Sequence, residues 1–145
     1  MRALLIDIGL TILLATSIAI YLLQPKTPVP LTFKDVEQNS IPIENMAIIL
    51  FWDQEVKASH RDIQLIQRFH QAHPNIQTIF VHSKDLSDDA LQDFLVNLGV
   101  YTTPAYTEIW PEQIPTTILL AHSTRVDLNH SPHYSQLMEF FNVEH

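Results

Sequence analysis

The 145-residue chain contains no cysteine and only two glycines. Without a thiol it cannot exchange a dithiol for a disulfide on its own, and no disulfide bond can stabilise it. It also lacks the clustered cysteines and methionines that soft copper(I) prefers. Gly9 and Gly99 stand far apart, so a glycine-rich loop that cradles phosphate is excluded.

Clusters of positive charge are absent as well. Eight Lys and Arg residues face sixteen Asp and Glu residues, for a formal net charge of −8, and the acidic residues are scattered rather than grouped in runs. This pattern argues against nucleic acid or an anionic membrane surface as a partner and is typical of a soluble domain surface.

An apolar segment opens the chain and runs from Ala3 to Leu23, with Asp7 as its single charge. About 20 apolar residues span a bilayer as a helix. We therefore expect residues 1–23 to form a membrane anchor that contacts the bilayer through residues 3–23. A cleaved signal peptide is the alternative, but the run is long for the apolar region of one, and no clear small-x-small cleavage site precedes Gln24-Pro25. Arg2 favours a cytoplasmic start, which would place the body of the protein outside the cytoplasm.

Residues 24–30 contain three prolines and predict an extended linker, and residues 31–145 are long enough for one domain. Apolar runs and helical periodicity predict alternating strands and helices. The expected order is an irregular hairpin over 32–43, a strand over 46–52, a helix from 59 to 73, a strand over 76–81, a helix over 87–98, an aperiodic connection over 100–113, strands over 116–121 and 125–128, and a last helix opened by Ser131-Pro132. Ser59 is the expected N-cap of the first helix.

Three stretches carry a family resemblance. Phe51-Trp52 closes the first buried strand, Ile114-Pro115-Thr116-Thr117 opens a later one, and Leu31-Thr32-Phe33-Lys34-Asp35 enters the domain. With the anchor, the linker and the long connection ending in 94–100, this order resembles the thioredoxin fold. It is most similar to membrane-anchored, TlpA-like and suppressor-of-copper-sensitivity type bacterial thiol–disulfide oxidoreductases. The likeness covers nearly the whole chain and rests on the order of its elements.

The resemblance implies a thioredoxin-like, three-layer α/β/α domain behind an N-terminal transmembrane helix. It also implies a single-pass protein of the bacterial inner membrane whose domain faces the periplasm. In such families the peptide bond that corresponds to Ile114-Pro115 is cis and faces the active-site cysteines, and its backbone pairs with an extended substrate segment. The alternative is a trans Pro115 that merely starts a strand.

The chain departs from this family where the chemistry should lie. Laid on the pattern Phe-Trp-x-x-x-Cys-x-x-Cys, the cysteine positions fall on Val56 and Ser59, with Lys57 and Ala58 between them. Valine has no nucleophilic atom, and a serine hydroxyl is a poor nucleophile without an adjacent base. His60 follows in sequence, but adjacent residues of a helix point in different directions, so a solvated His60 beside a capping serine is expected.

The buried acid that often relays protons in this fold is replaced too, because Leu50 stands before Phe51-Trp52. We therefore expect no unaided enzymatic activity and no cofactor. The first hypothesis is a binding or accessory module whose remnant groove is formed by Trp52, Ile114, Pro115 and Thr116 beside the degenerate positions. Its partner would be an envelope protein or peptide segment, with a redox-active protein of a thiol–disulfide or protein-maturation pathway as one candidate. Tyr101, Tyr106 and Trp110 are candidates to line this groove or to pack the irregular connection.

Two alternatives stay open. In the second hypothesis the chain descends from thiol–disulfide oxidoreductases and belongs to their pathway, but it is inactive alone. In the third, it is a periplasmic copper- or zinc-binding accessory protein that uses some of its eight histidines. The pairs His70/His73 and His130/His133 have a spacing that can share one ion on a helix, and His122 could approach the second pair. Neither pair has an obvious carboxylate third ligand, so histidines on a helix surface are the simpler interpretation, and no metal site is predicted.

Overall fold

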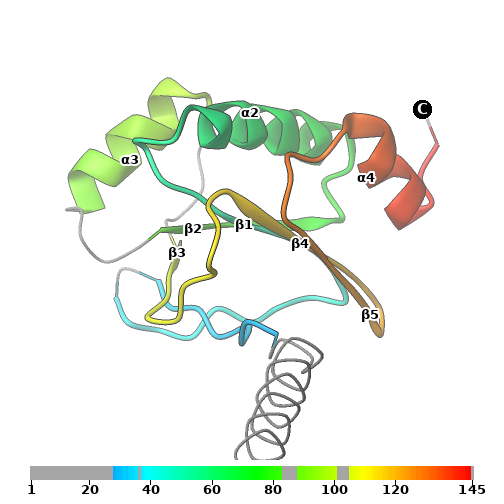
Figure 1. The fold of residues 1–145 in the computed structure, drawn as a ribbon, viewed down its shortest axis with the longest axis horizontal. Helices are drawn as coiled ribbons and strands as arrows, with labels where there is room; N and C mark the ends of the chain where they lie inside the picture. Colours follow the sequence, from blue (N-terminus) through cyan, green and yellow to red (C-terminus); the bar gives the residue numbers. More distant parts are fainter. Residues whose placement is uncertain (1–27, 36, 83–87, 101–104, 145) are drawn as a thin grey trace, which may run out of the picture.

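The computed structural model describes residues 28–35, 37–82, 88–100 and 105–144. Within these residues a single five-stranded sheet has the order β3-β2-β1-β4-β5 (Figure 1). The strands are β1 Met46–Phe51, β2 Gln77–His82, β3 Ala105–Tyr106, β4 Thr116–Ala121 and β5 Thr124–Leu128. The helices are α2 Lys57–Ala72, α3 Asp88–Asn97 and α4 Tyr134–Phe141. The predicted strands and helices are therefore present in the expected order.

Strand β1 lies at the centre of the sheet. It runs parallel to β2, with Leu50 opposite Phe80, and antiparallel to β4, with Phe51 opposite Thr116. A strand that is paired on both sides and covered on both faces must be apolar along its whole length. The continuous run that predicted β1 has this composition, and five of its six residues are buried.

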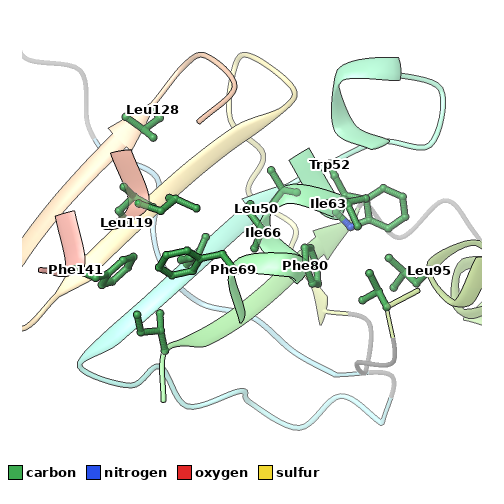
Figure 2. Packing of buried hydrophobic residues seen from close by; sticks show 14 of the residues in the cluster. Leu50, Trp52, Ile63, Ile66, Phe69, Phe80, Leu95, Leu119, Leu128 and Phe141 are labelled. Carbon is green, nitrogen blue, oxygen red and sulfur yellow. The ribbon is translucent and has the colours of Figure 1, made fainter. Parts of the chain in front are cut away.

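One face of the sheet carries all three described helices (Figure 1). Buried apolar side chains of the helices pack there against alternate residues of the strands (Figure 2). This core is formed by Ile48, Leu50, Trp52, Ile63, Ile66, Phe69, Ile76, Phe80, Leu91, Leu95, Val100, Tyr106, Leu119, Leu128, Leu137, Met138 and Phe141. The apolar residues whose spacing predicted the helices thus form the core on this face of the sheet.

The opposite face is covered by extended chain rather than by helices, within the residues that the structure describes. The partly buried side chains that pack over the buried residues of this face include those of Val29, Leu31, Ile41, Ile43, Trp110 and Ile114. Those buried residues are Phe33, Ile49, Phe51, Ile79, Val81, Ala105 and Ile118. The mixed α/β fold is confirmed, but the helical third layer of an α/β/α arrangement is not found here. Prolines in both covering segments account for this, since proline disrupts a helix interior.

Several element boundaries differ from the prediction. Helix α2 begins at Lys57 with Val56 as its N-cap residue, so Ser59 lies inside the first turn and is not the cap. Helix α4 begins at Tyr134, after Pro132. Strand β3 was not predicted, because two residues are too few to show periodicity, and it pairs with β2 and with Lys34. Lys34 also bridges to Ser40, which gives the expected irregular hairpin at the edge of the sheet.

The predicted anchor and most of the linker lie outside the described residues. None of the described helices is both long and apolar enough to cross a membrane.

Candidate functional site

The candidate site lies at the carboxyl end of β1. Phe51 is paired with Thr116, the first residue of β4, and the peptide bond between Ile114 and Pro115 is cis, as the resemblance implied. The Thr116 hydroxyl donates to the Gln113 carbonyl oxygen at 2.6 Å and closes the turn around this bond. The cis-proline therefore lies at the same end of the sheet as the loop that joins β1 to α2.

That loop is held by hydrogen bonds of its own. The Asp53 carboxylate accepts from the Glu55 amide at 2.8 Å, and the Asp53 carbonyl accepts from the Val56 amide at 3.1 Å. Val56 has an extended backbone (φ −99°, ψ 110°), and helix α2 follows directly. These two hydrogen bonds form a tight turn immediately before α2. The turn fixes the backbone at Val56 and thereby the residue at which the helix begins.

The four degenerate positions differ in exposure. Lys57 is exposed, Val56 and Ala58 are half-buried, and Ser59 is fully buried. The Ser59 hydroxyl accepts a hydrogen bond from the Asp53 amide at 3.2 Å, which ties the first turn of α2 to the end of β1. Ser59 therefore stabilises the loop, and its hydroxyl is not presented for attack.

The neighbouring His60 does not act as a base toward Ser59. Its Nε2 donates to the Gln54 carbonyl oxygen at 2.7 Å, and its ring lies 5.0 Å from the ring of Phe94. The expectation of a solvated His60 is thus wrong, because the imidazole is half-buried between the loop and α3. A serine–histidine nucleophile is excluded at this position.

Trp52 forms the floor of the site rather than its surface. Its side chain is fully buried, with its ring 5.2 Å from Phe94 and 4.7 Å from His82. Trp110 packs edge-on against Phe51 at 5.7 Å on the opposite face of the sheet. Tyr106 is buried, and Tyr101 lies outside the described residues. Sequence reasoning missed His82, whose only signal was its place at the carboxyl end of a parallel strand.

The peptide groups beside the cis-proline are available for pairing. No described residue donates to the Ile114 carbonyl or accepts from the Ile114 amide, and Pro115 has no amide proton to satisfy. Both residues are half-buried and stand just before the first paired residue of β4. An extended segment laid beside Ile114 can therefore form strand-type hydrogen bonds there.

The histidines do not gather into a metal site within the described part of the chain, where no three His, Cys, Asp or Glu side chains come together. One histidine of each candidate pair instead bonds to a nearby backbone carbonyl. His70 Nδ1 donates to the Ile76 carbonyl oxygen and His130 Nδ1 to that of Ser131, both at 3.0 Å, while His133 is the N-cap residue of α4.

A buried carboxylate occupies a place that the sequence analysis did not foresee. Asp62 lies on the inner side of α2, and neither of its carboxylate oxygens has a hydrogen-bond partner of good geometry among the described residues, although the Ser131 hydroxyl is close by. Burial raises the pKa of Asp62 above its usual range, while the Ser131 hydroxyl and the charges of Arg61 and His130 act in the opposite direction. Arg61 Nη2 itself donates to Ser131 Oγ at 3.0 Å.

The fold is that of thioredoxin-like thiol–disulfide oxidoreductases. The structure is similar to a secreted disulfide oxidoreductase of Mycobacterium tuberculosis, with a TM-score of 0.63 and 14% identity over 77% of this chain and 93% of the other. A secreted thiol-disulfide isomerase from Corynebacterium glutamicum gives a TM-score of 0.61 and 18% identity over 77% and 81%.

A third similar structure is a thiol:disulfide interchange protein of the thioredoxin family from Chlorobium tepidum, with a TM-score of 0.63 and 9% identity over 80% and 94%. No protein-family model and no curated protein matches the sequence. At these identities the similarity concerns the fold, and the absence of cysteine sets this chain apart from the chemistry that these names describe.

Proposed function

We propose that this chain is a redox-inactive, thioredoxin-like binding module that holds an extended segment of a partner protein beside Ile114-Pro115. The observation that carries the proposal is the peptide of Ile114, with which no described residue pairs, next to a cis-proline at the end of β4 nearest the start of α2. Strand-type hydrogen bonds supply affinity in such a mode, and neighbouring side chains supply specificity.

The residues around this peptide favour binding over exchange. Val56 offers an apolar side chain where a nucleophile would stand, and Ser59 is occupied by the Asp53 amide. A bound segment would contact Val56 and Thr116 without forming a covalent bond. The partner is then an envelope protein, or a redox-active protein that performs the thiol chemistry this chain lacks.

The cellular setting is part of the proposal. The apolar composition of residues 3–23 supports a membrane anchor at the bacterial inner membrane, with residues 31–145 on the periplasmic side. Alkaline extraction should leave the chain in the membrane fraction, and protease added to spheroplasts should digest the domain. Release by alkali, or protection of the domain, would contradict this setting and leave the binding site untouched.

Site-specific photo-crosslinking tests the binding site. A photoreactive amino acid placed at Val56 of the full chain in its native envelope should yield a discrete adduct. The matched control is the same probe at Ser135, an exposed residue of α4. Helix α4 packs on α2 through Phe69, about 20 Å along the helix from Val56. No adduct at Val56, or equal adducts at both positions, would refute a binding site beside the cis-proline.

A further inference from the structure

Strand β5 is the outer strand of the sheet, and none of the described residues pairs with its outer edge. The hairpin with β4 closes with Ala121 opposite Thr124, so these two residues exchange backbone hydrogen bonds. The alternation along an antiparallel pair then turns the peptide groups of Arg125 and Asp127 away from β4. No backbone hydrogen bond from the described residues reaches them.

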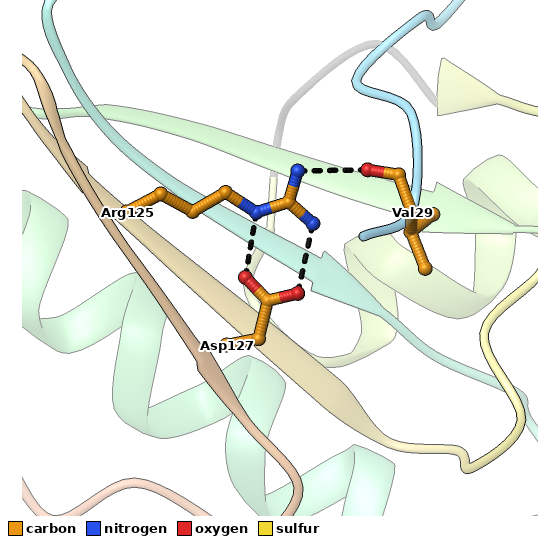
Figure 3. A network of polar contacts seen from close by, with 3 residues as sticks. All are labelled: Val29, Arg125 and Asp127. Carbon is orange, nitrogen blue, oxygen red and sulfur yellow. Dashed lines mark hydrogen bonds and ion pairs between the residues drawn. The ribbon is translucent and has the colours of Figure 1, made fainter. Parts of the chain in front are cut away.

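Along this edge two residues of opposite charge flank an exposed apolar residue. Arg125 and Asp127 lie on the same face and form a two-pronged ion pair with distances of 2.6 and 2.8 Å (Figure 3). Val126, between them, points to the other face and is 37% exposed, one of three exposed large apolar side chains among the described residues. An exposed edge of this length is normally guarded against pairing.

We propose that β5 pairs antiparallel with β5 of a second copy of this chain, which joins the two sheets across a twofold axis at Val126. In this register Arg125 of each copy stands opposite Asp127 of the other, and the outward peptide groups of these residues meet as hydrogen-bonded pairs. Val126 meets its own counterpart in the non-hydrogen-bonded position, where side chains approach most closely. The interface is isologous, as a closed dimer requires.

Charge selects this register over its neighbours. A shift of two residues in one direction brings Arg125 opposite Arg125, and a shift in the other direction brings Asp127 opposite Asp127. Both juxtapositions are repulsive, and a shift of one residue misaligns the outward peptide groups. The Arg-Val-Asp order is therefore complementary to itself in one antiparallel alignment only. For this reason we infer that the partner strand is β5 of a second copy rather than a strand of another protein.

The paired edge has five residues and buries less surface than a standard protein interface, so the association is weak. Disulfide crosslinking can detect such a weak contact. Because the chain has no cysteine of its own, a crosslink can form only through the introduced residue. Non-hydrogen-bonded neighbours have Cα atoms about 4.5 Å apart, within the range that a disulfide bridges. In the full chain in detergent micelles, Val126→Cys should form a disulfide-linked dimer under mild oxidant.

Matched variants make the test decisive. Val96→Cys on α3 is the control, because Val96 is 36% exposed and lies on a different element. Asp127→Arg should lower the dimer yield of Val126→Cys roughly tenfold, Asp127→Asn by less, and the exchange Arg125→Asp with Asp127→Arg should restore it. Equal yields at positions 126 and 96, or no effect of Asp127→Arg, would overturn the proposal. So would an adduct between Val126→Cys and a different protein on oxidation in cells.

Discussion

The indole of Trp52 lies parallel to the ring of Phe94, with 5.2 Å between the ring centroids and 8° between the planes. Trp52 directly follows β1, and Phe94 belongs to α3, so the stack fastens α3 over the end of the central strand. His60 of α2 packs edge-on against Phe94, with 5.0 Å between the ring centroids. Three elements thus meet beneath the candidate site.

Phe94→Ala should therefore destabilise the domain, by about 2–3 kcal/mol, because Phe94 is half-buried and its loss opens a cavity beside Trp52. Urea denaturation followed by circular dichroism measures the change. Val96→Ala, on the exposed side of the same helix, should change stability by no more than about 0.5 kcal/mol. Equal effects for the two variants would show that the ring stack does not anchor α3.

Leu50→Asp should be far more damaging. Leu50 is fully buried between β2 and β4 and belongs to the apolar cluster beneath the helices. Placing a carboxylate there should cost several kcal/mol, on the order of 4 or more, and reduce the folded population. A thermal melt compares it with Leu50→Met, which conserves volume. An unchanged midpoint for the aspartate would contradict the interior placement of this strand.

Asp62 should make the domain less stable as the pH rises, whereas an acid whose pKa is lowered by a salt bridge makes a protein more stable as the pH rises. Its pKa is raised above the ordinary value of 3.8, so the folded state takes up a proton at higher pH than the unfolded chain does. Between the two pKa values the folded state binds more protons, and the free energy of unfolding falls as pH rises. Above the raised pKa the buried charge remains a net cost.

Asp62→Asn should accordingly raise the free energy of unfolding at pH 7. The gain should shrink as the pH falls through the raised pKa toward 3.8, because both proteins are then neutral at this position. Urea denaturation at a series of pH values checks this, with Asp93→Asn on the exposed side of α3 as the control. A gain that does not vary with pH would assign the effect to something other than the charge.

Restoring two cysteines should restore a disulfide. In the double variant Val56→Cys and Ser59→Cys, the thiols stand on either side of the first turn of α2, where the Ser59 amide donates to the Val56 carbonyl oxygen at 3.0 Å. The helix N-terminus should lower the pKa of the half-exposed thiol at position 56. Thiol titration after mild oxidation should find no free thiol, whereas the single variants keep one. Two free thiols in the double variant would show that the loop does not place these side chains as the fold predicts.

Much of this fold could be predicted because its signals are local. The continuous apolar run of β1 and the spacing of Ile63, Ile66 and Phe69 report burial directly. The cis bond before Pro115 was different, since it followed from a family resemblance and not from periodicity. Helices on one face only could not be predicted, because which face a helix covers depends on the whole chain.

The candidate site was harder to predict from the sequence, because an error in the start of α2 also changed which of its residues were expected to be buried. Placing the N-cap at Ser59 rather than Val56 shifted the predicted start of α2 by three residues, so Ser59 and Asp62 were not recognised as buried positions of the helix. In the structure Ser59 and Asp62 continue the buried stripe of the helix. The turn that Asp53 makes with Glu55 and Val56 decided the true start, and no periodic pattern reports such a turn.

The contact between Arg125 and Val29 has a mechanical meaning. Arg125 Nη1 donates to the Val29 carbonyl oxygen at 2.8 Å, close to where the described chain begins (Figure 3). Val29 also packs on the buried residues of the sheet, so the first described residues are joined to the outermost strand and to the centre of the sheet at once. A pull on the first described residues would therefore act on the β4–β5 hairpin through Arg125 as well as on the sheet through Val29, so the hairpin shares a load that the strand supporting the site would otherwise bear alone.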